Sequence, residues 1–423
     1  MQFVTSQPSA ETALRYFATS AQGIEAVTAA ELTRLGATEV LAAPGGVLFT
    51  TDLRGLYRIV LNLRTATRVL RLLREFAAIN PEMLYSQVRR VPWEDYLNPQ
   101  MTFAVQTTMQ TGQRDGASDN RGPQRGSQQR GRGDGGRPSG GGTPGITHTQ
   151  FASLKIKDAI VDRLRKEQGE RPNVDRENPD VLVHAHFAGG RCTLNLDAVG
   201  GSLHERGYRS ESHAAPLKET LAAAIVLLSG WDGSVPFYDP MCGSGTLVIE
   251  AALQSLQIPP GLFREKFTCQ RWPDFRRDLW DEAVNEARSQ GRDAPAAPLF
   301  ASDNDPKAVE IAQQSANRAG VGDDIKFFVA DATTAPPPVE QPGILITNPP
   351  YGERLSNPAE VSDLYRRLGT QWKQHYAGWR ASVLAGNLSL AKELPLAASR
   401  KDRLRNGPLE CRLLHFEIGT VKR

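Results

Sequence analysis

The second half of the chain alternates apolar runs with helical patterns, and this alternation restricts its fold more than any other feature. Four of the apolar runs each lead into a polar residue that can form hydrogen bonds: 235–238 into Asp239, 299–301 into Asp303, 325–330 into Asp331, and 344–347 into Asn348. Alternation on this scale is typical of an α/β fold with a doubly wound, Rossmann-like sheet. Because ligands bind such sheets at the carboxyl ends of the strands, we expect these polar residues to meet in one crevice.

A glycine-containing loop follows the first run, with the sequence Asp239-Pro240-Met241-Cys242-Gly243-Ser244-Gly245-Thr246 before a helix expected over 247–256. Its glycines let the backbone approach a ligand where a side chain would clash. A dinucleotide fingerprint would need a third glycine at the position of Val248, and the loop has no Walker lysine. The loop by itself therefore indicates neither a dinucleotide site nor the phosphate site of an NTPase.

The acids after the second and third runs suit a nucleoside ligand. Asp303, ahead of a helix expected over 306–318, is placed to accept hydrogen bonds from a ribose diol, and Asp331 is suited to accept from an adenine amine. Either acid would also serve as the N-cap of a helix. For Asp305, next to Pro306, the N-cap is the preferred interpretation.

The fourth run ends in Asn348-Pro349-Pro350-Tyr351. An exocyclic amine on a base ring is a poor nucleophile because its lone pair is delocalised. An amide oxygen and a backbone carbonyl that both accept from the amine would favour its pyramidal form and direct the lone pair at a methyl donor. Prolines fix the carbonyl, and the tyrosine offers a face for a base that has left its stack. A strand-ending turn is the structural alternative.

From about residue 236 to the end, the sequence resembles class I methyltransferases with the Asn-Pro-Pro-Tyr motif of amino-group methylation. The resemblance implies S-adenosyl-L-methionine as cofactor and a direct in-line methyl transfer. No Pro-Cys nucleophile motif is present, so Cys242 is expected to pack in the loop. The implied catalytic residues are Asn348, Pro349, Pro350 and Tyr351, and the implied cofactor-binding residues are Asp239, Pro240, Cys242, Gly243, Gly245, Thr246, Asp303, Asn304, Asp331, Ala332 and Asn348.

The first half carries a different organisation. A chain of 423 residues is too long for one ordinary core, and a smaller α/β or α+β unit is expected near the start. From about 111 to 142 the composition changes to Gly, Arg, Gln, Ser and Pro, which predicts a disordered insert. Because a strand is expected before it (101–107) and an amphipathic helix after it (150–165), the insert interrupts a domain. It resembles flexible Arg-Gly segments found beside nucleic acids, and a loop without function is the alternative.

Arginine is concentrated between residues 54 and 90, where eight arginines face only Glu75 and Glu82: Arg54, Arg58, Arg64, Arg68, Arg71, Arg74, Arg89 and Arg90. Although the net charge of the chain is only +3, this local excess is a candidate basic patch for phosphate contacts. A solvated helix face, with arginine stems covering apolar neighbours, is the alternative.

Segments 16–19, 62–70 and 150–160 resemble the ferredoxin-like plus THUMP arrangement of RNA-modifying enzymes, and 202–209 and 214–220 resemble the group of bacterial 23S rRNA guanine-N2 methyltransferase L. The resemblance implies a ferredoxin-like domain (1–75), a THUMP RNA-binding domain (76–200) and a methyltransferase domain (201–423). It implies guanine-N2 methylation of 23S rRNA, with tRNA as the near alternative. The motif by itself also fits adenine-N6 methylation of DNA or glutamine methylation of protein, and an RNA-binding factor with an inactive methyltransferase fold is a further alternative.

Several other functions are not expected. The four cysteines form neither a CxxC pair nor a disulfide framework, so we expect reduced thiols. No apolar run approaches the length of a membrane span, and the first ten residues lack the features of a secretory signal. We therefore expect a cytoplasmic protein with RNA as its partner and without a membrane or metal requirement.

Overall fold

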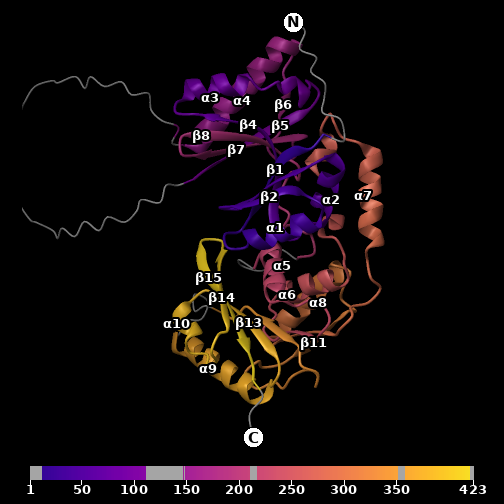
Figure 1. Ribbon diagram of the computed structural model, residues 1–423, viewed down its shortest axis with the longest axis vertical. Coiled ribbons are helices and arrows are strands. Elements are labelled where there is room, and N and C mark those ends of the chain that lie inside the picture. Colours follow the sequence, from indigo (N-terminus) through magenta and orange to yellow (C-terminus); the bar gives the residue numbers. More distant parts are fainter. Residues whose placement is uncertain (1–11, 111–145, 147, 210–216, 351–357, 420–423) are drawn as a thin grey trace, which may run out of the picture. The chain divides into compact units, whose positions relative to one another are not determined.

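The structure is a computed structural model that describes residues 12–110, 146, 148–209, 217–350 and 358–419. Its contacts divide the chain into two compact units, one formed by Met1–Leu72 with Asp197–Arg423 and the other by Leu73–Leu196. Figure 1 shows the helices and strands of both units. Among the described residues, no helix has the length and apolar character needed to cross a bilayer. The Gly/Arg-rich insert predicted at 111–142 lies outside the described residues.

The first unit begins with a small α+β domain whose strands are ordered β2-β3-β1-β4. Strand β1 is antiparallel to both β3 and β4. The elements are β1 (Leu14–Ser20), α1 (Glu25–Arg34), β2 (Thr38–Ala43), β3 (Gly46–Thr51), α2 (Leu53–Asn62) and β4 (Ala66–Ala77). Helix α2 starts where the Asp52 side chain accepts a hydrogen bond from Gly55 N at 2.7 Å. It buries Leu56 and Val60, four positions apart, on one face.

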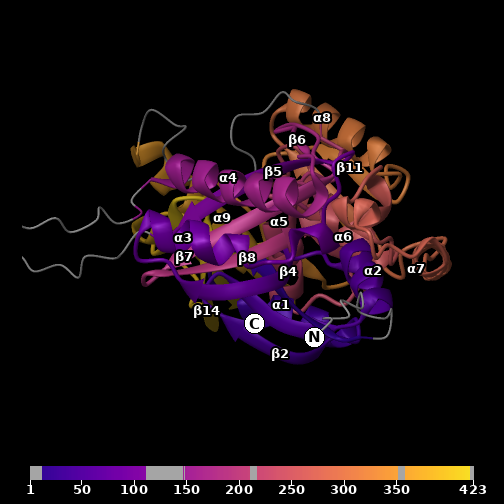
Figure 2. The ribbon, with the colours of Figure 1, turned by 90° about the horizontal axis from the view of Figure 1, so that it is seen from above.

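The second unit holds four strands of the same eight-stranded sheet, in the order β8-β7-β5-β6. Strands β5 and β7 are parallel, and β7 and β8 are antiparallel. Helices α3 and α4 lie side by side on this unit (Figure 2). The elements are α3 (Pro81–Arg89), η1 (Trp93–Asp95), β5 (Thr102–Met109), α4 (Thr149–Gln168), β6 (Asn173–Val174), β7 (Val181–Ala188) and β8 (Arg191–Asp197). The strand and helix expected around the insert are thus β5 and α4.

The C-terminal half contains a seven-stranded sheet in the order β11-β10-β9-β12-β13-β15-β14. Its strands are β9 (Phe237–Asp239), β10 (Leu299–Asp303), β11 (Ile325–Val329), β12 (Ile344–Thr347), β13 (Arg380–Ala385), β14 (Arg400–Asn406) and β15 (Leu409–Glu417). The first five are parallel, as the alternation predicted. The last two are antiparallel, so the expectation of alternation to the C-terminus was wrong there. Only Gly407 and Pro408 join them, and a parallel connection needs a dozen or more residues.

Helices cover both faces of this sheet (Figure 1). In β12, Ile344 and Ile346 pack into one core with residues of α5, α6 and α8, whereas Leu345 packs into a second core with residues of α9. This alternation follows from the period of two in a strand. The covering helices are α5 (Glu219–Leu228), α6 (Thr246–Ser255), α8 (Pro306–Arg318), α9 (Pro358–His375) and α10 (Leu388–Ala391).

The N-terminal domain packs against the segment that holds η2 (Pro260–Phe263), η3 (Thr268–Arg271) and α7 (Arg277–Ser289). Tyr57 of α2 contacts the rings of Phe275 and Trp280, and its hydroxyl accepts from Arg276 N at 3.0 Å. Gly261 lies so close to α2 that a Cβ there would be 2.5 Å from Leu61 Cα. These contacts make the N-terminal domain and the C-terminal half one compact unit.

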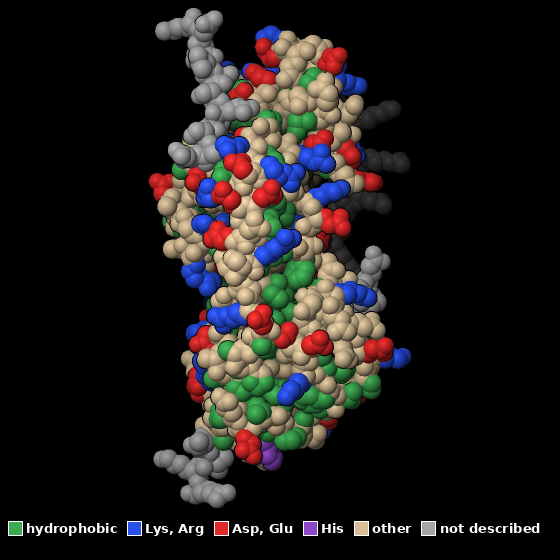
Figure 3. All heavy atoms as spheres, turned by 90° about the vertical axis from the view of Figure 1, so that its right-hand side faces the viewer, with side chains coloured by type: hydrophobic (Ala, Val, Ile, Leu, Met, Phe, Trp, Pro, Cys, Tyr) green, Lys and Arg blue, Asp and Glu red, His purple; other side chains and the backbone are tan. Residues whose placement is uncertain are grey.

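Most arginines of the arginine-rich stretch form contacts with other residues of the protein, although the side chain of Arg54 is 50% exposed. Six of the eight arginines have internal partners: Arg54 with Glu282, Arg58 with Glu286, Arg64 with the Leu253 and Ile258 carbonyls, Arg68 with Asp197, Arg71 with Asp274, and Arg74 with Gln87. On the face shown in Figure 3, Lys and Arg side chains are interspersed with Asp and Glu. The excess of arginine in the sequence therefore does not produce one continuous basic surface on this face.

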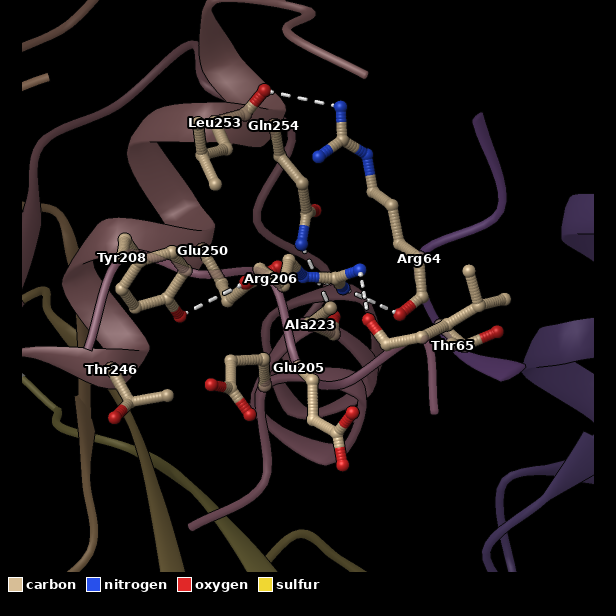
Figure 4. A network of polar contacts seen from close by, with 12 residues as sticks. Arg64, Thr65, Glu205, Arg206, Tyr208, Ala223, Thr246, Glu250, Leu253 and Gln254 are labelled. Atoms are coloured by element: carbon tan, nitrogen blue, oxygen red, sulfur yellow. Dashed lines mark hydrogen bonds and ion pairs between the residues drawn. The ribbon is translucent and has the colours of Figure 1, made fainter. Parts of the chain in front are cut away.

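A buried ion pair connects the N-terminal domain with the C-terminal half (Figure 4). Arg206 donates to both carboxylate oxygens of Glu250, at 2.8 and 3.2 Å, and to the Arg64 carbonyl at 2.7 Å. The Tyr208 hydroxyl donates to Glu250 at 3.1 Å. The side chains of Arg206 and Glu250 are 1% and 0% exposed. One guanidinium therefore connects a linker, the N-terminal domain and helix α6.

Removing one partner of this pair should be costly because the other charge stays buried without compensation. We expect Glu250→Leu to lower the free energy of unfolding by about 3–5 kcal/mol, measured by urea denaturation. The double variant Arg206→Met/Glu250→Leu should recover part of this loss. The exposed pair supplies a control, since Arg54→Gln should cost less than about 1 kcal/mol. A Glu250→Leu protein as stable as wild type would show that the pair is not a structural centre.

Candidate cofactor and substrate site

The four polar residues predicted to converge lie at the ends of four neighbouring strands, in the sheet order β11-β10-β9-β12. Asp303 is level with Val329, Ala301 with Asp239, and Leu345 with Tyr238. Asp239 and Asp303 are the last residues of their strands, Asn348 follows β12 directly, and Asp331 lies two residues after β11. All four are therefore at the carboxyl edge of the parallel part of the sheet.

Asp239 is buried beneath the loop that it begins. The residue is 1% exposed, and its carboxylate accepts from Met241 N at 3.3 Å. Burial raises its pKa well above the ordinary aspartate value, and the negative charge of Asp303 raises it further, while the Met241 hydrogen bond opposes the shift. The residue supports the loop from inside.

The loop between β9 and α6 is held in place by main-chain hydrogen bonds. Cys242 N donates to the Ser302 carbonyl at 2.9 Å, and Gly243 N donates to Asp303 Oδ2 at 2.9 Å. Gly243 has a φ of 53°, and a Cβ built on it would meet no atom within 4 Å. Gly245 has a φ of 81°, and its Cβ would lie 3.0 Å from that of Ala312. Gly245 thus lets the loop pack on α8, and Gly243 leaves open space above it.

Asp303 can bind a ligand, whereas its neighbour Asp305 caps a helix. Asp303 is partly exposed, and its other oxygen accepts from Asp305 N at 3.1 Å. Each carboxylate oxygen has a further lone pair, so Asp303 can still accept from a ligand. Asn304 is exposed beside it. Asp305 caps α8 by accepting from Lys307 N at 2.9 Å, as predicted.

Asp331 lies near the other end of this edge of the sheet. One carboxylate oxygen accepts from Thr333 N at 2.8 Å and from the Thr333 hydroxyl at 2.7 Å, and the other lies 3.7 Å from Arg367. Partial burial opposes ionisation, but the Thr333 hydrogen bonds and Arg367 outweigh it and lower the pKa of Asp331. Ala332 is 6% exposed and packs into the core on the α9 side. Asp331 is therefore a fixed carboxylate, 48% exposed, that can accept from a ligand.

The Asn-Pro-Pro segment leaves the end of β12 toward α9. Asn348 and Pro350 are half-buried and Pro349 is buried. The Pro350 carbonyl lies 3.5 Å from the Tyr365 hydroxyl, which belongs to α9. Tyr351, the last residue of the motif, lies outside the described residues. Of the predicted catalytic residues, the structure thus places Asn348, Pro349 and Pro350 at the edge that carries the acids.

The sequence did not identify two residues that support the start of α6, Arg209 and Glu219. Arg209 Nη2 donates to the Thr246 hydroxyl at 2.8 Å, and its Nε lies 3.1 Å from Glu219 Oε1 at the start of α5. Arg209 also donates to the Leu217 carbonyl. The partners of Arg209 are 8 to 37 residues away in the chain, so no local spacing could identify them. The resemblance of 202–209 and 214–220 to one enzyme group was the only signal.

Cys242 does not have the environment of a nucleophile. Its side chain is buried, and burial, followed by the charges of Asp239 and Asp303, raises the pKa of its thiol well above the ordinary value. A thiolate is the reactive form of cysteine. The expectation that Cys242 packs in the loop agrees with this environment.

Comparisons with known proteins establish the family. A model of the RlmL ferredoxin-like domain matches residues 15–70, one of the THUMP domain matches 143–197, and one described as "RMKL-like, methyltransferase domain" matches 206–415. A Synechocystis protein named "Putative RNA methyltransferase slr0064" is 38% identical over 403 residues, covering 95% of this chain and 96% of that protein. The chain belongs to this THUMP-domain methyltransferase family. The predicted ferredoxin-like, THUMP and class I methyltransferase folds are confirmed.

Two further similarities bear on this family member. The "Ribosomal RNA large subunit methyltransferase K/L" of Syntrophotalea carbinolica is 39% identical over 97% of this chain but only 54% of that protein, so the chain spans about half its length. The crystal structure of SMU.472, "a putative methyltransferase complexed with SAH", covers 97% of this chain and 99% of that one, with 30% identity and a TM-score of 0.82.

The buried carboxyl group of Glu219, which is paired with Arg209, should make the stability of the protein depend on pH. Burial raises the pKa of Glu219 from 4.5 to about 7, against the opposing charge of Arg209. Because the folded protein holds this proton more tightly than the unfolded chain, the contribution of Glu219 to the free energy of unfolding should fall as pH rises from about 4.5 to 7, by at most about 3 kcal/mol. Glu219→Gln should remove most of this fall in urea denaturation measured across that pH range.

The exposed Glu310 of α8 provides the control. Glu310→Gln should keep the pH profile of the wild-type protein, because its carboxylate is not buried. An unchanged profile in Glu219→Gln would mean that Glu219 does not titrate in this window.

Proposed function

We propose that this protein transfers a methyl group from S-adenosyl-L-methionine to the exocyclic N2 amine of a guanosine in 23S rRNA. The observation that carries the proposal is that Asn348 and Pro349 lie at the same carboxyl edge of the sheet as the three acids. The three family-model matches support it, since they join a THUMP domain to a methyltransferase domain in one chain.

The cofactor is S-adenosyl-L-methionine, which supplies an electrophilic methyl group on its sulfonium. The loop fits such a ligand, because Gly243 leaves space that a side chain would fill and its conformation favours glycine. Asp303 would accept hydrogen bonds from the ribose hydroxyls, with its position already fixed by Gly243 N and Asp305 N. Asp331 would accept from the adenine amine. Buried Asp239 would act indirectly by holding the loop.

The amine to be methylated would be held by the Asn-Pro-Pro segment. The Asn348 side-chain oxygen and a neighbouring backbone carbonyl would accept its two N–H groups, keeping the lone pair directed at the methyl carbon. Proline has a restricted φ, and Pro349 is buried, so the carbonyl has little freedom to turn away. Preorganised acceptors of this kind cost no reorganisation during the reaction.

The substrate assignment rests on the first half of the chain. A THUMP domain and a ferredoxin-like domain favour RNA over the DNA or protein substrates that the Asn-Pro-Pro-Tyr motif also fits. Relatives named for the large ribosomal subunit favour 23S rRNA over tRNA, although the chain matches about half of their length. An inactive fold is disfavoured because each acid and the complete motif are present.

Cofactor binding can be tested at Asp303. We expect Asp303→Ala to weaken S-adenosyl-L-methionine binding by about 1.5–3 kcal/mol in calorimetry, since a charged acceptor of two hydroxyls is lost. The neighbouring Asp305→Ala is a matched control, because its carboxylate caps α8 and faces no proposed ligand group. Undiminished affinity in Asp303→Ala would remove this residue from the site.

Catalysis can be tested at Asn348. Asn348→Ala should abolish most methyl transfer while leaving the affinities for cofactor and RNA nearly unchanged, because its interaction matters chiefly when the amine attacks. The assay follows labelled methyl into rRNA or tRNA that lacks the modification, with nucleoside analysis of the product. Wild-type turnover would refute the mechanism, and labelled N6-methyladenosine would refute the guanine assignment.

The role of Tyr351 follows from the motif and has a different signature. Tyr351→Ala should weaken capture of the target base by about 1–3 kcal/mol, because a stacking face is lost. Tyr351→Phe should restore much of the activity in the same methyl-transfer assay, since the ring supplies the stacking. Equal loss in both variants would show that the hydroxyl, and not the ring, is required.

A further inference from the structure

Two arginines of the arginine-rich stretch remain after the internal contacts are assigned. Arg89 is the last residue of α3 and Arg90 is its C-cap. Within the described part of the chain, neither forms an ion pair with an acidic side chain. Arg89 instead places its guanidinium over the Tyr85 ring, 5.6 Å from the centroid.

A hollow of about 330 Å³ lies beside these two residues, between α3 and α4. Four of the side chains that line it are basic and one is acidic. The lining residues are Tyr85, Ser86, Arg89, Arg90, Arg163, Lys166 and Glu167. Arg163 is paired with Glu94, and Lys166 lies 3.0 Å from Glu167. The charge that is not offset therefore comes from Arg89 and Arg90.

The wall of the hollow is held in place by contacts from α4. Arg163 Nη1 donates to the Arg89 carbonyl at 3.0 Å, which fixes the last turn of α3. The Tyr85 hydroxyl donates to Asp162 at 2.6 Å, which fixes the ring on which the Arg89 guanidinium lies. Arg89 is thereby restrained before any ligand binds, and such restraint lowers the entropy cost of binding.

We propose that this hollow binds the phosphodiester backbone of the RNA substrate, with Arg89 and Arg90 as its phosphate ligands. The proposal rests on the proposed RNA methyltransferase function and names a contact surface for it. Guanidinium groups match phosphate oxygens in charge and geometry. Basic residues at a helix C-terminus also interact favourably with the helix dipole. That role does not require two adjacent arginines at the rim of a hollow whose other charges are already paired.

The test compares two double variants that remove the same charge from the same unit. Arg89→Gln/Arg90→Gln changes the hollow, whereas Arg171→Gln/Arg176→Gln removes two exposed arginines that do not line it. Binding of a fluorescein-labelled RNA hairpin is measured by fluorescence anisotropy over a range of KCl concentrations. We expect the hollow variant to bind about tenfold more weakly at moderate salt. Its slope of log affinity against log salt should be smaller by about 1 to 2.

The control variant should stay within about twofold of wild type, and both variants should keep the wild-type melting temperature. Because Arg90 is exposed, Arg90→Glu is a second variant that does not alter the Arg89–Tyr85 contact, and it should weaken binding further than Arg90→Gln. Wild-type affinity in the hollow variant, or an equal loss in the control, would overturn this site alone. A wild-type protein that binds no RNA would overturn the proposed RNA substrate as well.

Discussion

The buried pair of Arg206 and Glu250 is the interaction on which the arrangement of the first unit depends. A guanidinium and a carboxylate taken out of water are tolerated only when nearly every polar atom is satisfied. Here Arg206 donates to Glu250 and to the carbonyls of Leu203 and Arg64, while Tyr208 donates to Glu250. The linker, the N-terminal domain and α6 must all be in position for these contacts to form. The pair therefore makes their packing interdependent.

The same helix connects this centre to the proposed cofactor site. Helix α6 begins at Thr246, directly after Gly245, and Glu250 lies one turn further along. Thr246 accepts from Arg209, which is three residues after Arg206 in the linker. Arg206 and Arg209 of the linker thus form hydrogen bonds with residues in the first two turns of α6. A displacement of the linker would be transmitted to the glycine loop through these contacts.

The position of the proposed chemistry follows from the sheet. Parallel strands end at one edge, so side chains far apart in sequence are delivered to the same place, and the loops between them can vary without disturbing the core. The antiparallel pair β14–β15 lies beyond β13 and leaves the order β11-β10-β9-β12 unchanged. The N-terminal domain contacts the linker and α7, and it contributes none of the proposed reacting groups.

Local sequence determined the elements and the edge of the sheet that carries the site. Asp239, Asp303, Asp331 and Asn348 were predictable because each follows its own apolar run, and a strand places its next residue at the sheet edge. The Asp305 cap was predictable because capping involves atoms only two or three residues apart. Long-range partners were decided by the tertiary structure alone. Arg58 meets Glu286, 228 residues away, and Arg206 meets Glu250, 44 residues away, so no spacing in the sequence distinguished these arginines from Arg89 and Arg90. Whether a charge pairs internally depends on what the fold places beside it, and that information is not present in the local sequence.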